Sequence, residues 1–205
     1  MQQKEYLLYP LFSTPLMSVL LSLDNKKILK HLKKIKYRNT NKDNFFSQIS
    51  IDNKILNKNY FKELKKTFEK SVVLYLQKLE YGQSFKILNS WSTKTPNKSS
   101  SESHVHSNSW ISGVYYPHED KSFSIMFEKN NYNFMYNVEY TNYNNIYTSS
   151  TYTVNPKTGT LLIFPSTLMH KITKNNSDED RYSIAFNIVP VGTFNKGRDS
   201  EITYG

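Results

Sequence analysis

The chain has 205 residues and a formal net charge of +10, and it contains no cysteine. This length suffices for one domain with a sizeable core, so we expect a single domain over residues 1–205. The absence of cysteine excludes disulfides, thiolate zinc sites and cysteine nucleophiles.

The N-terminal segment predicts neither a signal peptide nor a membrane span. No basic stretch leads into an apolar one after Met1, and Pro10, Pro15 and several Ser and Thr interrupt the apolar run from Tyr6 to Leu23. We expect this run to be an extended segment that packs on the domain. The protein is expected to be cytoplasmic.

Residues 24–36 predict an amphipathic helix. Ile28, Leu29, Leu32 and Ile35 fall on one face at helical spacing, and Asp24 is suited to cap the first turn. His31 lies beside this apolar stripe and is expected to be a boundary residue.

Residues 58–80 predict a second helix. Asn59 is suited to cap its start, and Gly82 follows its end. The lysines outside the stripe predict a solvated face. Its apolar stripe consists of Tyr60, Phe61, Leu64, Phe68, Val72, Tyr75, Leu76 and Leu79.

After Gly82 the chain changes to short strands rich in aromatic and β-branched residues. A polar loop is expected over 93–103, and residues 129–150, rich in Asn and Tyr, predict a hairpin or a loop that contacts the substrate. The expected fold is mainly β with flanking N-terminal helices, a double-stranded β-helix of the jelly-roll or cupin type. Helical support covers about 24–80 and the β core about 83–192. Strands are expected at 85–91, 110–116, 123–127, 152–154, 160–164 and 182–189.

Three of the five histidines form a candidate metal site. His104 and His106 lie two residues apart, which in a strand places both imidazoles on one face. His170 follows the apolar strand 160–164, where the strand is expected to run out into a loop. Imidazole suits iron, zinc, copper and nickel, so the spacing predicts one metal held between two strands.

Arg181 begins the last strand and is a candidate anion-binding residue, because its planar fork matches a carboxylate. Ser183 shares its face if Ile184 and Phe186 pack on the other. The alternative for Arg181 is a surface ion pair with one of the acidic residues at 178–180.

The sequence leaves the roles of Tyr115 and Tyr116 open. One of Tyr115 and Tyr116 is expected to fill the core while the other reaches the site. His118 follows Pro117 and precedes Glu119 and Asp120, so we expect it to be an exposed loop residue.

Together these motifs resemble the iron(II)- and 2-oxoglutarate-dependent oxygenases of cyanophages and marine bacteria, which are related to prolyl 4-hydroxylases. The resemblance covers most of the chain after Phe85 and a short N-terminal piece. The matching segments are Leu11 to Pro15, Trp91, His104-x-His106 running into Ile111 to Tyr116, Gly159 to Ser166, His170, and Arg181 to Asn187.

The resemblance implies Fe(II) bound by His104, His106 and His170, with 2-oxoglutarate and O₂ as cosubstrates. The distal carboxylate of 2-oxoglutarate would pair with Arg181, assisted by Ser183 and Tyr116, and Asn187 joins the predicted cosubstrate-binding set. The implied reaction releases succinate and CO₂ and hydroxylates a substrate. A protein side chain, and within that class a prolyl residue, is the expected substrate by analogy of fold.

His106 departs from the broader superfamily, which uses two histidines and one carboxylate. With three neutral ligands, the metal site carries one positive charge more than the usual site with a carboxylate. Its affinity for Fe(II) is therefore expected to be lower. Glu102, two residues before His104, is the nearest carboxylate in sequence. We expect three histidine ligands.

Two other functions are compatible with the sequence. One is a cupin-like enzyme with three histidines that does not use 2-oxoglutarate. The other is a non-enzymatic basic β-module, of the kind found in phages, that binds nucleic acid or has a structural role. The positive charge also leaves nucleic acid open as a substrate, although a compositional bias toward Lys and Asn explains it equally well.

Overall fold

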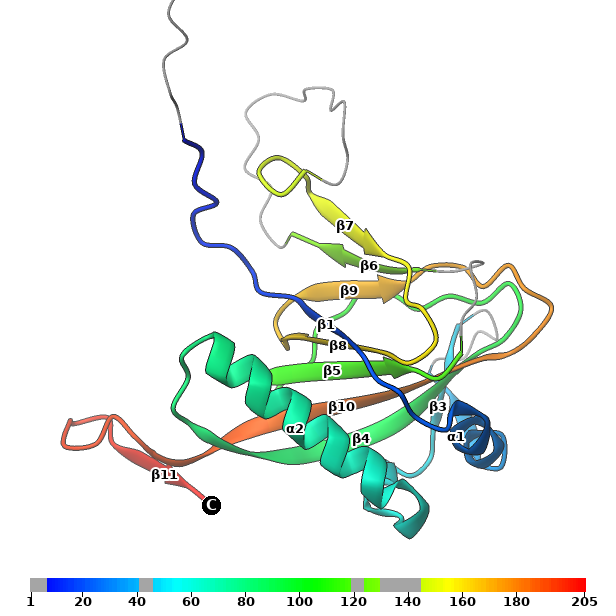
Figure 1. Ribbon diagram of the computed structural model, residues 1–205, viewed down its shortest axis with the longest axis horizontal. Helices are drawn as coiled ribbons and strands as arrows, with labels where there is room; N and C mark the ends of the chain where they lie inside the picture. The colour runs from blue at the N-terminus through cyan, green and yellow to red at the C-terminus, as the bar shows by residue number, and fades with distance from the viewer. Residues whose placement is uncertain (1–6, 41–45, 119–123, 130–144) are drawn as a thin grey trace, which may run out of the picture.

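The computed structural model describes residues 7–40, 46–118, 124–129 and 145–205. Two antiparallel sheets face each other, and the helices cover the outer face of the larger sheet (Figure 1). The predicted mainly β fold with flanking N-terminal helices is confirmed.

The larger sheet has the order β1-β8-β5-β10-β4-β3-β2, and all of its neighbouring strands are antiparallel. A short strand, β11, pairs with the far end of β10. The bounds are β1 Met17–Leu20, β2 Tyr37–Asn39, β3 Gln48–Ser50, β4 Ser84–Thr95, β5 Ile111–Tyr116, β8 Thr160–Pro165, β10 Arg181–Phe194 and β11 Ile202–Tyr204.

The smaller sheet has the order β7-β6-β9, with β6 Ile125–Glu128, β7 Thr151–Val154 and β9 Met169–Ile172. Alternation along the strands divides the core in two. One set of apolar side chains fills the space between the sheets, and the other packs under the helices. The first set is Val114, Tyr116, Ile125, Phe127, Leu162 and Phe164.

The two helices bury apolar faces that consist largely of the residues predicted for them. Helix α1 spans Asn25–Leu32, and Asp24 caps it by accepting a hydrogen bond of 3.0 Å from the amide of Lys27. Helix α2 spans Lys62–Lys78 and follows two short 3₁₀ turns, Ile55–Asn57 and Asn59–Phe61. Phe68 of α2 stacks on Phe186 of β10 with ring centroids 5.1 Å apart.

Both helix ends differ from the prediction. Helix α1 stops at Leu32, where the hydroxyl of Tyr37 donates to the carbonyl of Leu32, instead of continuing to residue 36. In α2, no side-chain hydrogen bond caps the start, so the predicted cap at Asn59 is wrong. At the C-terminal end, Glu80 and not Gly82 takes the left-handed conformation, with φ of 58°, and the amide of Tyr81 reaches back to the carbonyl of Leu76.

Strands β4 and β10 are longer than predicted. They pair from Arg181 opposite Thr95 onward, so Thr93 to Thr95 belong to β4 and not to a loop. A bulge shifts the register between Asn187 and Ile188. Cross-strand pairing with β10 overrides the local polar composition that predicted a loop.

Gly113 of β5 leaves room for the ring of Phe186, which lies opposite it on the neighbouring strand β10. A Cβ atom at position 113 would overlap that ring. Absence of a side chain at this position therefore lets Phe186 reach Phe68 of α2.

Only part of the N-terminal segment packs as predicted. Met17–Leu20 pairs with β8, but Leu7 and Phe12 are 71% and 100% exposed. Residues 119–123 and most of the predicted element at 129–150 lie outside the described residues. No described helix is both long enough and apolar enough to cross a membrane.

Candidate metal and cosubstrate site

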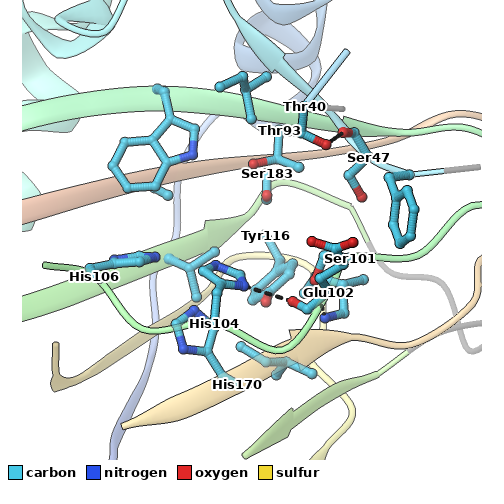
Figure 2. A pocket seen from close by; sticks show the side chains of 18 of the residues that line it. Thr40, Ser47, Thr93, Ser101, Glu102, His104, His106, Tyr116, His170 and Ser183 are labelled. Carbon is cyan, nitrogen blue, oxygen red and sulfur yellow. Dashed lines mark hydrogen bonds between the residues drawn. The ribbon is translucent and has the colours of Figure 1, made fainter. Parts of the chain in front are cut away.

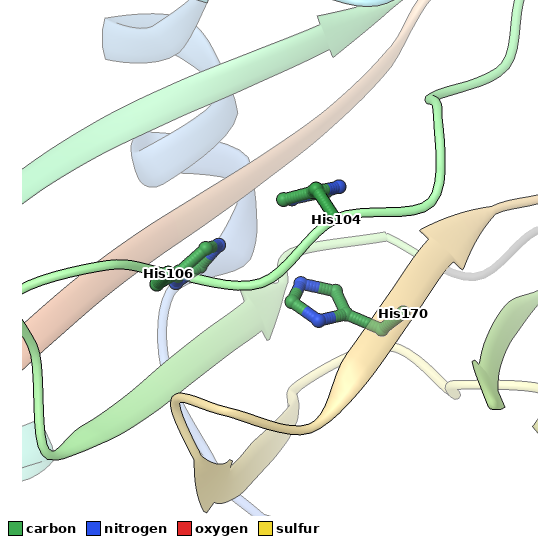
Figure 3. Close-up of side chains that lie close together, drawn as sticks. All are labelled: His104, His106 and His170. Atoms are coloured by element: carbon green, nitrogen blue, oxygen red, sulfur yellow. The ribbon is translucent and has the colours of Figure 1, made fainter. Parts of the chain in front are cut away.

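Three histidines meet between the two sheets. His104 and His106 come from the segment between β4 and β5, and His170 comes from β9 (Figure 3). One ring nitrogen of each lies within 4.8 Å of those of the other two. Their ring centroids are 4.4 to 5.3 Å apart. The structure thus brings together all three predicted residues.

The main chain holds these histidines in a different way from the predicted strand end. His104 forms an isolated antiparallel bridge with His170, and the amide of His106 donates to the carbonyl of Ser166 at 2.9 Å. His170 lies within β9 and not in a loop, because a turn at 166–168 returns the chain from β8 into the smaller sheet.

The Nδ1 atom of each ring already has a partner. His104 Nδ1 donates to the carbonyl of Glu102 at 2.8 Å, and His170 Nδ1 donates to the carbonyl of Leu168 at 2.9 Å. A carbonyl can only accept, so these rings carry their proton on Nδ1 when neutral. This tautomer leaves Nε2 as the atom able to ligate a metal.

A set of buried polar side chains holds the ring of His106. Its Nδ1 lies 2.7 Å from Oδ1 of Asn187 and 2.8 Å from the hydroxyl of Ser112, which in turn contacts the hydroxyl of Ser166 at 2.8 Å. Ser112 and Ser166 are both fully buried. The four side chains form one network that fixes the orientation of the imidazole.

Asn187, predicted to belong to the cosubstrate-binding set, thus contacts a candidate metal ligand. It shares a face of β10 with Arg181, but six residues of extended chain separate them by about 20 Å. Its carboxamide contacts His106 at the opposite end of that face.

Burial keeps two of the rings neutral. It lowers the pKa of His106 to about 4, although the hydrogen bond to Asn187 opposes this change. Burial likewise lowers the pKa of His170 to about 3, and the neighbouring His104 and His106 act in the same direction. Both rings are therefore unprotonated at neutral pH, as metal ligation requires.

A cavity of about 220 Å³ opens beside the histidines. Figure 2 shows the histidines on one side of it and Thr93, Ser183 and Ser47 on the other. Most of its lining is apolar or aromatic, and Glu102 is the one carboxylate among its described lining residues. Its apolar lining includes Phe46, Ile49, Trp91, Val114, Ile125, Phe164, Ile172 and Ala185.

The predicted carboxylate-binding residues lie on the inner face of β10 and on β5. Ser183 and Tyr116 line the cavity, whereas Tyr115 faces the helices and its hydroxyl donates to Asn25. Arg181 does not line the cavity but is buried, 3% exposed, at the first position of β10. Burial raises the pKa of the Tyr116 hydroxyl, and the positive charge of Arg181 opposes that rise.

The acidic neighbours of Arg181 have other contacts. Asp180 forms an ion pair of 2.9 Å with Lys94, and Asp178 accepts a hydrogen bond from Asn97. His118 is not the exposed loop residue that was predicted: it is partly buried, and its Nε2 accepts a hydrogen bond of 3.1 Å from the amide of Tyr182. Its sequence neighbours are polar, so only the approach of β10 reveals this role.

Sequence reasoning missed Ser112 and Ser166. Ser112 lies within the apolar strand β5, where alternation directs its side chain inward, and Ser166 directly follows the apolar strand β8 at the start of a turn. An inward hydroxyl needs a hydrogen-bond partner, and that requirement was the available signal.

The fold is a double-stranded β-helix, and the three histidines form a candidate imidazole metal site within it. The family model described as "Putative 2OG-Fe(II) oxygenase" matches residues 89–187, which contain the three histidines and Arg181. Over this range, which is just under half of its length, the chain is similar to the 2OG-Fe(II) oxygenases, whose cofactors are Fe(II) and 2-oxoglutarate. The two alternative functions, a cupin without 2-oxoglutarate and a basic binding module, receive no support from this match.

Solved structures support the same fold. A prolyl 4-hydroxylase from Pseudomonas putida has 12% identity and a TM-score of 0.57, over 85% of this chain and 92% of that one. A Trichoplax adhaerens prolyl hydroxylase, in complex with a hypoxia inducible factor peptide, has 13% identity and a TM-score of 0.58, over 84% and 82%. SnoN, an epimerase of nogalamycin biosynthesis, has 12% identity and a TM-score of 0.62, over 91% and 81%. Comparison with the curated proteins gives no match.

Proposed function

We propose that this oxygenase is a hydroxylase whose iron is held by His104, His106 and His170. The observation that carries the proposal is the convergence of three rings whose ligand atoms lie within 4.8 Å of one another. Two of their Nδ1 atoms donate to carbonyls and the third contacts Asn187 and Ser112, so every Nε2 is left for the metal.

The donor set fits a divalent iron. Neutral imidazole suits Fe(II), and burial keeps His106 and His170 neutral. Within the described residues, the candidate ligand group contains these three histidines and no carboxylate. The absence of an anionic ligand leaves the full double charge on the ion, so anionic cosubstrates are attracted more strongly and the metal itself is held less tightly.

Arg181, Ser183 and Tyr116 would receive the distal carboxylate of 2-oxoglutarate. A guanidinium in a buried setting interacts strongly with a carboxylate, because little water screens the pair. Ser183 and Tyr116 both line the cavity, so each has a hydroxyl group that could donate to this carboxylate. Bound iron and 2-oxoglutarate supply the oxidation: the keto acid gives succinate and CO₂, and one oxygen atom of O₂ goes to the substrate.

The chain's own contribution is orientation and exclusion of water. Ser112, Ser166 and Asn187 fix His106, while the apolar lining from both sheets shields the reacting groups. The expected substrate is a protein side chain, with a prolyl residue as first choice. Likeness to two prolyl hydroxylases, one with a peptide bound, supports this choice.

The experiment is succinate formation by the protein loaded with Fe(II) and supplied with 2-oxoglutarate and O₂. Wild type is expected to form succinate, and to form more of it when prolyl peptides are added. Mass spectrometry is expected to show that these peptides gain one oxygen atom. Arg181→Gln is expected to raise the KM for 2-oxoglutarate. An iron-loaded protein that neither binds nor consumes 2-oxoglutarate would contradict the proposal and favour the cupin-like alternative.

A further inference from the structure

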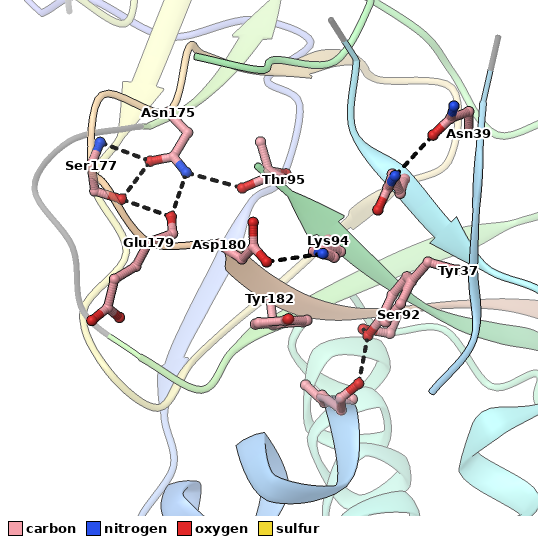
Figure 4. A network of polar contacts seen from close by, with 12 residues as sticks. Tyr37, Asn39, Ser92, Lys94, Thr95, Asn175, Ser177, Glu179, Asp180 and Tyr182 are labelled. Atoms are coloured by element: carbon pink, nitrogen blue, oxygen red, sulfur yellow. Dashed lines mark hydrogen bonds and ion pairs between the residues drawn. The ribbon is translucent and has the colours of Figure 1, made fainter. Parts of the chain in front are cut away.

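The loop between β9 and β10, residues 173–180, ends directly at Arg181 and is held by buried polar contacts (Figure 4). At its centre is Asn175, a polar residue with no solvent exposure. The proposed mechanism assigns no role to Asn175. A buried carboxamide is costly unless its hydrogen-bonding groups are satisfied, so its contacts define what it stabilises.

The carboxamide of Asn175 joins two parts of its own loop to the end of β4. Its Nδ2 donates to the carbonyls of Thr95 and Glu179, both at 2.9 Å. Its Oδ1 accepts from the amide of Ser177 at 3.1 Å and lies 2.8 Å from the Ser177 hydroxyl. Both donor hydrogens and both acceptor positions are therefore used.

The main chain of Asn175 is fixed as well. Its amide donates to the carbonyl of Ser99 at 2.8 Å, and its carbonyl accepts from the amide of Lys98 at 2.7 Å. These bonds tie the loop to the segment that follows β4.

The same contacts converge on the neighbours of Arg181. Thr95, whose carbonyl Asn175 binds, is the cross-strand partner of Arg181 in the β4–β10 register. Asp180, which precedes Arg181, forms an ion pair with Lys94. The amide of Tyr182, which follows it, donates to His118. The main chain is thus fixed on both sides of Arg181.

We propose that Asn175 is a positioning residue for 2-oxoglutarate binding: its carboxamide holds the β9–β10 loop and Thr95 so that the Arg181 guanidinium meets the distal carboxylate. This inference rests on the proposed role of Arg181. The side chain is specific to the task, because aspartate has the same shape but lacks both donors, and glutamine is one methylene longer. Holding a ligand-binding group in place before the ligand arrives lowers the cost of binding.

The test is titration of 2-oxoglutarate into the protein loaded with Mn(II), by calorimetry, with Mn(II) affinity measured separately. The variants are Asn175→Asp, Ser177→Ala, Arg181→Gln and the double variant Asn175→Asp with Arg181→Gln. Asn57→Asp, which makes the same chemical change at an exposed position that contacts Lys65, is the matched control.

Asn175→Asp is expected to weaken 2-oxoglutarate binding by about tenfold, as the loss of two hydrogen bonds would give. Mn(II) affinity is expected to stay unchanged, since the histidines lie on other segments. In the Arg181→Gln background the Asn175 substitution is expected to add little, because a positioning residue acts through the residue that it positions. Ser177→Ala removes one contact of the Asn175 side chain and is expected to weaken 2-oxoglutarate binding to a smaller extent. If Asn175→Asp does not fold, the Ser177→Ala result tests the proposal in its place.

Two results would overturn the inference while leaving the proposed function intact. One is normal 2-oxoglutarate binding in folded Asn175→Asp, or in Ser177→Ala if the former does not fold, when Arg181→Gln binds weakly. The other is an equal loss of Mn(II) and 2-oxoglutarate binding, which would indicate a purely structural role. Unchanged 2-oxoglutarate binding in Arg181→Gln would instead contradict the proposed role of Arg181 itself.

Discussion

His104 and His170 are joined through their main chains as well as through the site they form: the amide of each donates to the carbonyl of the other, both at 3.0 Å. This bridge links the segment before β5 to β9, and the two rings lie 4.4 Å apart. The spacing of two candidate ligands is therefore set by backbone pairing and not by the metal alone.

Removal of a ligand should abolish metal binding. We expect His104→Ala and His170→Ala to lose stoichiometric Fe(II), measured by elemental analysis after anaerobic loading. Glu102→Ala should retain it, because Glu102 lines the cavity but is not part of the candidate ligand group. Full iron occupancy in His170→Ala would exclude the three-histidine assignment.

The contact between Asn187 and His106 should tune metal affinity. Asn187→Leu removes the acceptor at Nδ1, and loss of such an outer partner costs roughly 10- to 100-fold in metal affinity. Asn187→Asp keeps an acceptor and should bind close to wild type. Competition with a chelator measures both, with Asn57→Leu as the surface control, and equal affinities in all variants would show that the contact has no such role.

Gly113→Ala should destabilise the protein by about 1–3 kcal/mol, the usual cost of overpacking. The new methyl group would overlap the ring of Phe186. Gly82→Ala, where a Cβ meets nothing within 4 Å, is the control and should change stability little. Urea unfolding of the metal-free protein measures the difference, and equal midpoints for the two variants would contradict the packing argument.

Glu80→Gly should stabilise the protein by about 1 kcal/mol, even though glycine usually weakens helices. Glu80 has a φ of 58° just after α2, a conformation that glycine adopts without strain. The same substitution at Glu69, inside α2, should cost about 1 kcal/mol. Thermal unfolding checks the opposite signs, and a loss at both positions would show that the left-handed conformation at Glu80 carries no strain.

The metal-free protein should lose stability as the pH falls below about 6.5. Folded His106 and His170 have pKa values of about 4 and about 3, so in this range the unfolded chain binds more protons than the folded one. Each such histidine contributes a slope of up to about 1.4 kcal/mol per pH unit. The unfolding free energy is measured at about pH 7.5, 6 and 5, values that lie on both sides of the ordinary histidine pKa of about 6.5. It should change less steeply with pH for His170→Gln than for wild type.

Local patterns in the sequence determined much of the fold. The apolar spacing of Ile28 and Leu32 marked a helix face. The condition set for Ser183 is also met, because Ile184 and Phe186 pack on the opposite face of β10, under the helices. The histidine triad was accessible for the same reason, since strand order and residue spacing restrict which side chains meet.

Long-range pairing accounts for what the sequence concealed. Asn175 and His118 sit among polar neighbours that resemble ordinary loop residues, and their roles depend on the approach of β4 and β10. The contact between Asn187 and His106 was equally hidden, because alternation identifies a face of β10 but not a position along it. The end of α2 shows a third case, where the return of the chain toward β4 imposes a conformation on Glu80 that its side chain does not favour.

The bulge between Asn187 and Ile188 divides β10 into two stretches with different freedom to change. A one-residue slip before it would turn Arg181, Ser183 and Asn187 toward the helices and dismantle both halves of the site together. Beyond it, the stretch that pairs with β11 can accept an insertion, a deletion or a fused tag without moving any of these residues. The C-terminal hairpin is thus the natural attachment point for labels or surface immobilisation in studies of this enzyme.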